Sequence, residues 1–246
     1  MLTARRWNIE RLLRMLSAFF FCLAAGLFAQ LLLPEGIAKT GDGRFLSAVL
    51  HVVFFHVGAF LCVARLLNLE GTTWSEGFGL GTGGWFKPIL IGVGVALLAT
   101  PVTMFLQQLM AFSMEAVHVE PKAQETVKVI RESVELDQRV FYGFLAILFA
   151  PVTEELLFRG VFYQALKSRG YRKAAVWGTS MLFALVHYNV LTFIPLTFLA
   201  LVFIALYERT GNLLAPIAAH GCFNAINFAL LMLNDEIQAW AARTTT

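Results

Sequence analysis

Long apolar runs are the feature that most constrains how this chain can fold. A helix needs roughly 20 apolar residues to cross the hydrocarbon core of a membrane. In lipid, backbone polar groups must pair within the segment, so such runs form helices. We therefore predict an all-α, polytopic transmembrane helical bundle of seven spans, or eight if a re-entrant piece interrupts the chain near Tyr188. The expected spans are 15–33, 46–66, 87–112, 140–166, 174–190, 191–207 and 212–233.

The composition agrees with a membrane protein. Of 246 residues, 58% are hydrophobic and 14% charged, whereas a soluble domain is about half apolar and a quarter charged. The net charge of +3 is too small and too dispersed to indicate nucleic-acid binding. The three cysteines form no C-x-x-C pair, which argues against a zinc knuckle or a redox motif. The expected surroundings are thus a lipid bilayer, with no nucleic acid.

Basic residues predict the orientation, because cytoplasmic loops are rich in Lys and Arg. The N-terminal arm carries Arg5, Arg6, Arg11 and Arg14, and the loop 167–173 carries four basic residues and no acid. We expect both on the cytoplasmic side of a multi-pass cell-membrane protein, with the N-terminus cytoplasmic.

The connection 113–139 then falls outside. It holds six acidic and four basic residues, and Val127, Ile130 and Val134 recur at helical spacing. We expect a helix that lies on the surface or packs over the bundle. The predicted organisation is residues 1–139 as N-terminal spans plus this amphipathic segment, and residues 140–235 as a catalytic helical core.

The stretch 71–86 contains G-x-G-x-x-G at Gly79, Gly81 and Gly84. A dinucleotide fingerprint follows a strand and opens a helix inside a βαβ unit. Here one apolar span precedes the motif and another follows it. We therefore interpret it as a flexible cytoplasmic connection.

Ionisable groups inside the spans are the strongest functional signal, because charge within a membrane is costly. The fourth span holds Glu154, Glu155 and Arg159. Residues four apart share a helix face, so Glu155 and Arg159 can pair, which lowers the cost of burying both. Glu154 points about 100° away around the helix. We expect it to lack that partner.

Histidines and an amide add polar groups in other spans. His187 follows Phe183 by one turn, and His220 and Asn224 are also one turn apart. His51 and His56 in the second span are further candidates that we expect to serve packing.

Depth connects the polar groups of three spans. At 1.5 Å per residue, Glu154 and His187 lie about 20 Å from the basic loop 167–173. By the same measure, His220 and Asn224 lie about 17 and 22 Å beyond Arg209. Together they could line one water-filled cavity. Pro151 supports this, because it frees a backbone carbonyl that needs a partner or cavity water.

A carboxylate, two imidazoles and an amide around water suit peptide hydrolysis. The carboxylate can act as general base on water, and imidazole and amide N–H groups can stabilise the developing oxyanion. The same groups also permit a zinc site, since two His and one Glu can hold zinc with an open position. Such a site would use Glu154, His187 and His220, although the chain has no H-E-x-x-H motif.

Three motifs resemble the CPBP family, also called Abi: CAAX prenyl endopeptidases and bacteriocin-processing or self-immunity membrane proteins. E-E-x-x-x-R stands at residues 154–159, F-x-x-x-H at 183–187 and H-x-x-x-N or D at 220–224. They occur in family order, inside spans. The resemblance covers about residues 140–235.

The resemblance implies an all-helical intramembrane endopeptidase that needs no metal cofactor. It implies that Glu154, helped by His187, activates water and that His220 and Asn224 stabilise the oxyanion. Glu155 would support the site, and Arg159 would be structural. The expected partner is a prenylated or other peptide or protein substrate in or at the membrane. A zinc-dependent protease, a non-enzymatic self-immunity or scaffold protein and, more weakly, a transporter remain as alternatives.

Overall fold

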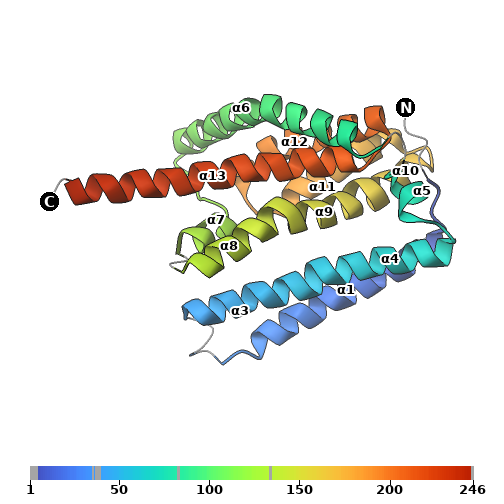
Figure 1. The fold of residues 1–246 in the computed structure, drawn as a ribbon, viewed down its shortest axis with the longest axis horizontal. Coiled ribbons are helices and arrows are strands. Elements are labelled where there is room, and N and C mark those ends of the chain that lie inside the picture. The colour runs from blue at the N-terminus through green and yellow to red at the C-terminus, as the bar shows by residue number, and fades with distance from the viewer. Residues whose placement is uncertain (1–4, 35, 37–39, 82–83, 133–134, 245–246) are drawn as a thin grey trace. The chain divides into compact units, whose positions relative to one another are not determined.

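The computed structural model describes residues 5–34, 36, 40–81, 84–132 and 135–244. Every regular element among them is a helix (Figure 1), which confirms the all-α prediction. The elements are α1 Ile9–Leu31, α3 Gly41–His51, η1 Val52–Val57, α4 Gly58–Glu70, α5 Trp74–Phe78, α6 Phe86–Ala116, α7 Glu125–Glu132, α8 Leu136–Phe144, η2 Leu145–Phe149, α9 Ala150–Glu155, η3 Leu156–Tyr163, α10 Gln164–Lys167, η4 Ala174–Gly178, α11 Thr179–Leu185, α12 Val190–Thr210 and α13 Leu214–Thr244, where η marks π-helical stretches.

Six helical stretches of the described chain are long and apolar enough to cross a membrane, and the protein is therefore a multi-pass membrane protein. They are Ile9–Leu31, Gly41–Glu70, Phe86–Ala116, Leu136–Lys167, Val190–Thr210 and Leu214–Asn234.

The predicted count of seven or eight spans is corrected at 174–190, where the helix is too short to be counted with the six long spans. The helix there covers only Ala174–Leu185, which is 12 residues, or about 18 Å at 1.5 Å per residue. It ends because Tyr188 adopts a positive φ of 49°. Asn189 then caps the next helix by accepting a hydrogen bond from the Thr192 amide at 3.1 Å. An apolar run alone does not reveal such a turn.

The chain forms two compact units that do not follow its linear order. The first unit comprises Met1–Trp85, Val152–Thr179 and Tyr207–Leu213, and the second comprises Phe86–Pro151, Ser180–Leu206 and Leu214–Thr246.

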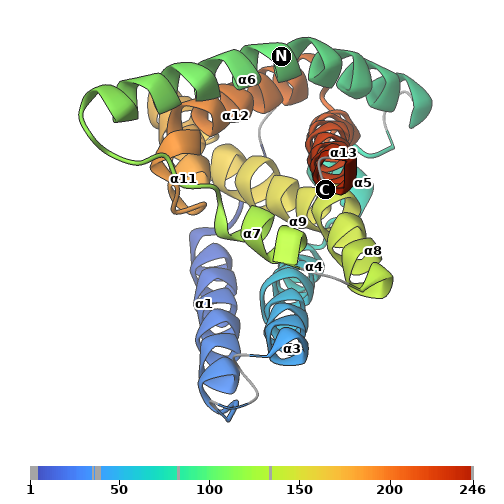
Figure 2. The same ribbon diagram turned by 90° about the vertical axis from the view of Figure 1, so that its left-hand side faces the viewer.

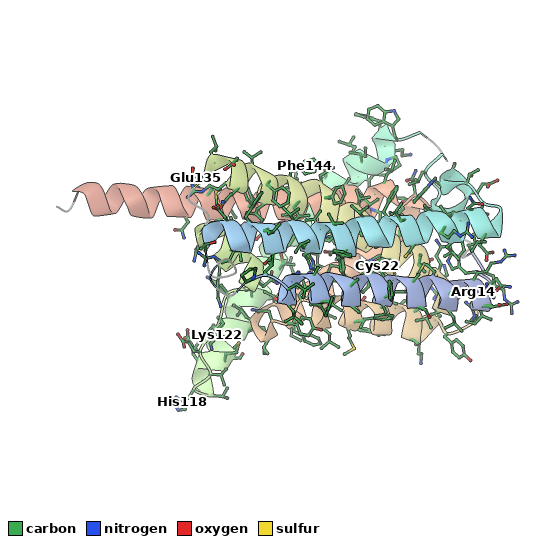
Figure 3. All side chains as sticks on the ribbon, turned by 90° about the horizontal axis from the view of Figure 1, so that it is seen from below. Arg14, Cys22, His118, Lys122, Glu135 and Phe144 are labelled. Carbon is green, nitrogen blue, oxygen red and sulfur yellow. The ribbon has the colours of Figure 1, made fainter. Side chains whose placement is uncertain are left out.

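In the first unit, α1 lies beside α3, η1 and α4, as Figures 1 and 2 both show. Small residues allow the approach. A Cβ on Gly26 would lie 2.6 Å from the Phe54 Cβ, and one on Gly58 would lie 3.2 Å from the Cys22 Cβ. Figure 3 shows Cys22 midway along α1. Close packing at small residues is a common way to join membrane helices.

One end of the first unit gathers four segments around the buried side chain of Gln164. Gln164 accepts a hydrogen bond from the Arg5 amide at 2.8 Å. It donates to the Gly77 carbonyl and the Tyr207 hydroxyl at 3.1 and 3.0 Å. Arg169 of the basic loop donates to the Trp7 carbonyl at 2.9 Å. The N-terminal arm and the loop 167–173 therefore lie at the same end of this unit.

Within the described part of the glycine-rich stretch, Trp74–Phe78 form the short helix α5. Thr73 and Glu76 form a capping box at the start of α5, and the hydrogen bonds from Thr73 hold the pKa of Glu76 below its usual value. Gly79 has a φ of +71°, and a Cβ there would lie 1.8 Å from the Gly211 carbonyl oxygen. No strand precedes it in the described chain. Packing therefore accounts for Gly79, and a dinucleotide site does not.

The second unit is built around the contact of α6 with α13. Its core includes Ala96, Ala99, Leu199, Phe203, Leu206, Ala215 and Ala219. The backbones meet at Gly92, where a Cβ would lie 2.3 Å from the Ala215 carbonyl oxygen. The expected amphipathic helix is α7, and its Ile130 is buried. Val134 lies outside the described residues.

Pro151 leaves a carbonyl in η2 without its backbone donor. In η2 the Ala150 amide donates to the Leu145 carbonyl, five residues back. The next bond in this register would run from residue 151 to Ala146, but proline has no N–H. Asn224 of α13 supplies the donor instead, and its Nδ2 lies 2.7 Å from the Ala146 oxygen. This confirms that the freed carbonyl needs a partner.

Substitution of Gly92 by Ala is expected to lower the thermal stability of the detergent-solubilised protein, because the added methyl group would force α6 and α13 apart. Gly94→Ala is the matched control, since a Cβ there meets nothing within 4 Å. Ala is about 1 kcal/mol better than Gly in a helix, so this control should be neutral or stabilising. Equal melting temperatures for the two variants would contradict the packing described.

A double-mutant cycle tests the substitute hydrogen bond. Asn224→Ala should cost about 1 kcal/mol of unfolding free energy, as for other interhelical bonds in membranes. In a Pro151→Ala background the cost should shrink, because the new amide can donate to the η2 carbonyl. Asn227→Ala is the control, because Asn227 bonds the Phe223 carbonyl of its own helix. Identical costs for Asn224→Ala in both backgrounds would disprove the coupling.

Candidate active site

The first unit places the E-E-x-x-x-R motif on one continuous helix. Glu155 and Arg159 form an ion pair at 2.8 Å, and their side chains are 0% and 1% exposed. The predicted pairing is therefore confirmed. It is local to the helix, and each charge of the pair lowers the cost of burying the other. The π-helical stretch η3 begins directly after Glu155.

Glu154 is half-buried next to this pair. The guanidinium of Arg159 interacts electrostatically with Glu155 and, more weakly, with Glu154. The expectation that Glu154 lacks this partner was therefore too simple, because charge acts over a longer range than a hydrogen bond. Two carboxylates share one guanidinium, and the three side chains sum to a formal charge of −1.

His51 lies close enough to Glu154 for their charges to interact. The His51 ring stacks on Phe55 with centroids 5.2 Å apart, and the buried His56 lies 5.8 Å from His51. Packing accounts for His56, as expected. No sequence pattern links His51 to Glu154, because only tertiary packing brings α3 to α9.

The second unit brings the two predicted histidines together around one aromatic ring. The Phe183 ring centroid lies 4.9 Å from that of His187 and 5.7 Å from that of His220. His220 is buried and also stacks on Phe203 at 5.2 Å. Phe183, the first residue of F-x-x-x-H, thus contacts both imidazoles.

Hydrogen bonds fix the other polar atoms of this group. The Nδ1 of His187 lies 2.7 Å from the Phe183 carbonyl oxygen, which leaves its Nε2 as the nitrogen that can exchange protons if Nδ1 carries the hydrogen. Asn224 holds the Ala146 carbonyl, as an interhelical hydrogen bond would. An amide has two N–H donors, so one remains for a ligand or substrate.

The predicted residues therefore form two polar groups. Glu154, Glu155 and Arg159 belong to the first unit, and His187, His220 and Asn224 belong to the second. Within either unit, the described residues include no group of three or more His, Cys, Asp or Glu positioned to hold a metal ion. Chemically, the first group offers a base, and the second offers proton-sharing and hydrogen-bond-donating side chains.

Comparisons with known proteins bear on the same segment. Residues 136–226 match the family model described as type II CAAX prenyl endopeptidase Rce1-like. The uncharacterized protein YpbD of Bacillus subtilis (strain 168) is 34% identical over 87 residues, which are 34% of this chain and 41% of that protein. The chain thus spans less than half the length of this relative. No solved structure matches the chain.

All six residues of the two polar groups fall inside the matched stretch. Over residues 136–226, the chain is therefore similar to the type II CAAX prenyl endopeptidases described as Rce1-like.

Proposed function

We propose that this protein is an intramembrane endopeptidase in which Glu154 activates the attacking water. The observation that carries the proposal is the net negative charge of Glu154, Glu155 and Arg159 within an apolar span. Intramembrane charge is costly and is typical of functional sites. Arg159 interacts most strongly with Glu155, so Glu154 is the carboxylate that is less committed to the ion pair.

The second polar group supplies the remaining roles. His187, oriented by its own Nδ1 contact and by Phe183, shares the proton that Glu154 removes from water. His220 and the second N–H of Asn224 donate to the oxyanion that forms when water attacks the carbonyl. The bond from Asn224 to Ala146 supports this role, because it fixes the amide in place.

The substrate is a peptide or protein in or at the membrane. The family contains prenyl endopeptidases, so a prenylated C-terminal segment is one substrate class to test. Water must reach Glu154 and the scissile bond, and its half-buried side chain is compatible with such access.

We also propose that the N-terminus and the loop 167–173 face the cytoplasm of a cell-membrane protein. Support comes from the shared end of the first unit, where Arg169 binds the Trp7 carbonyl and Gln164 binds the Arg5 amide. Basic residues concentrate there, as they do on the cytoplasmic side of membrane proteins.

Replacement of Glu154 by Gln is expected to reduce cleavage by two to four orders of magnitude, which is about the contribution of a general base, while the protein still inserts and folds. Comparative proteomics of membranes that contain wild-type or Glu154→Gln protein should reveal uncleaved peptides in the variant. Undiminished cleavage by Glu154→Gln would refute the proposal.

Glu155→Gln is the matched comparison, one residue along the same helix. It removes the ion-pair partner of the buried Arg159, and breaking a buried pair costs about 3–5 kcal/mol, so folded protein should be lost rather than chemistry alone. Chelation separates the zinc alternative, with ligands Glu154, His187 and His220: activity lost on metal stripping and restored by zinc would favour it. Full biological protection by a Glu154→Ala, His220→Ala double variant would favour a non-enzymatic role.

Cysteine labelling tests the orientation. In a background without Cys22, Cys62 and Cys222, we expect Lys122→Cys to react with an impermeant maleimide in intact cells. We expect Lys173→Cys to react only after permeabilisation. Both lysines are exposed, so burial does not explain a difference. The reverse pattern would overturn the proposed topology.

A further inference from the structure

A basic cavity lies in the first unit where α1 begins and α4 ends. Its volume is about 430 Å³. Three arginines and one glutamate among its lining residues give it a formal charge of +2. It is lined by Arg6, Trp7, Asn8, Ile9, Arg11, Glu70 and Arg169. None of these residues belongs to either polar group of the candidate active site.

Two of the arginines are held in place by backbone carbonyls. Arg169 donates to the carbonyls of Ala165 and Trp7 at 2.7 and 2.9 Å. Arg11 donates to the Leu69 carbonyl and lies 3.5 Å from Glu70. Carbonyl groups are uncharged, so they position Arg169 without neutralising it. These bonds use two of its five N–H groups, which leaves donors for an anion.

The first turn of α1 adds positive electrostatic potential beside the cavity, and the buried Trp7 indole lies in its wall. Asn8 caps α1 by accepting from the amides of Glu10 and Arg11, and the first turn of a helix carries partial positive charge. The Trp7 side chain is 1% exposed. Its indole N–H has no acceptor within the described part of the chain. This nitrogen is enclosed by the protein and is not accessible from the cavity, so the basic residues carry the site.

The surroundings are apolar on one side. Ile9 lines the cavity and is 55% exposed, as is Leu13 one turn along α1. Phe20 and Phe21 continue this exposed apolar surface toward the middle of the span. A ligand with a phosphate and a hydrocarbon tail would contact both the basic cavity and the apolar surface of α1. A soluble phosphate would contact the basic cavity alone.

We propose that this cavity binds the phosphate of an anionic phospholipid, whose acyl chains lie along α1. Basic pockets beside membrane helices on the cytoplasmic side are suited to anionic headgroups. The phosphate oxygens accept hydrogen bonds from Arg6, Arg11 and Arg169. This inference does not depend on the proposed peptidase activity.

Native mass spectrometry of the full chain in neutral detergent tests the site. Titration with dioleoyl-phosphatidylglycerol should give saturable binding, and dioleoyl-phosphatidylcholine should bind at least tenfold more weakly. Arg6→Gln and Arg11→Gln should each weaken binding roughly fivefold, as expected for one basic residue near a lipid surface. Arg6 is exposed, so its variant should fold normally.

Arg14→Gln is the matched control. Arg14 lies near the same end of α1 (Figure 3) but pairs with Glu10 at 2.6 Å and does not line the cavity. Its variant should bind the lipid like wild type. An equal loss in Arg14→Gln, or equal binding of the two lipids, would overturn the site. Displacement of the lipid by millimolar inorganic phosphate or by an acidic peptide would show a soluble anion site and overturn the lipid assignment.

Discussion

The buried ion pair of Glu155 and Arg159 is the constraint on which the rest of this structure depends. Two fully buried charges cost several kcal/mol each unless they compensate one another. Because the partners are one turn apart on the same helix, the span that carries the charges also carries their compensation. The neighbouring Gly160 allows the Phe78 ring to approach, since a Cβ there would lie 2.7 Å from it. Charge compensation and helix packing therefore coincide in this segment.

A second compensating interaction, the hydrogen bond from Asn224 to the Ala146 carbonyl, involves the part of the helix that precedes Glu154. Pro151 removes an amide from the helix, and Asn224 replaces the lost donor from α13. Before Glu154, the interhelical hydrogen bond from Asn224 offsets the loss of the Pro151 amide. After it, the ion pair of Glu155 and Arg159 lowers the cost of burying those two charges. Between them the helix from Leu136 to Lys167 continues without a break. A polar segment is tolerated in this apolar span because a specific residue compensates the missing amide and another compensates the buried charge.

Local geometry decides what the sequence could predict. Helical periodicity and hydropathy alone predict the Glu155–Arg159 pair, the shared face of His220 and Asn224, and all six long spans. The span at 174–190 was wrong because one residue with positive φ, Tyr188, ends a helix inside an apolar run. The proximity of His51 to Glu154, the contact of Phe183 with two imidazoles and the close approach of Gly79 to Gly211 depend on the way the chain packs. Periodicity carries no information about those contacts.

The amide of Asn224 shows why a motif position can be more restricted in one chain than in its family pattern. The pattern H-x-x-x-N or D permits a carboxylate, which accepts hydrogen bonds but, when ionised, cannot donate them. In this protein the group must donate, because its Nδ2 lies 2.7 Å from a carbonyl oxygen that Pro151 has left without an amide. An ionised aspartate would place negative charge against that oxygen. The amide is therefore required by the proline 73 positions earlier in the chain, and its second N–H remains available for the chemistry proposed.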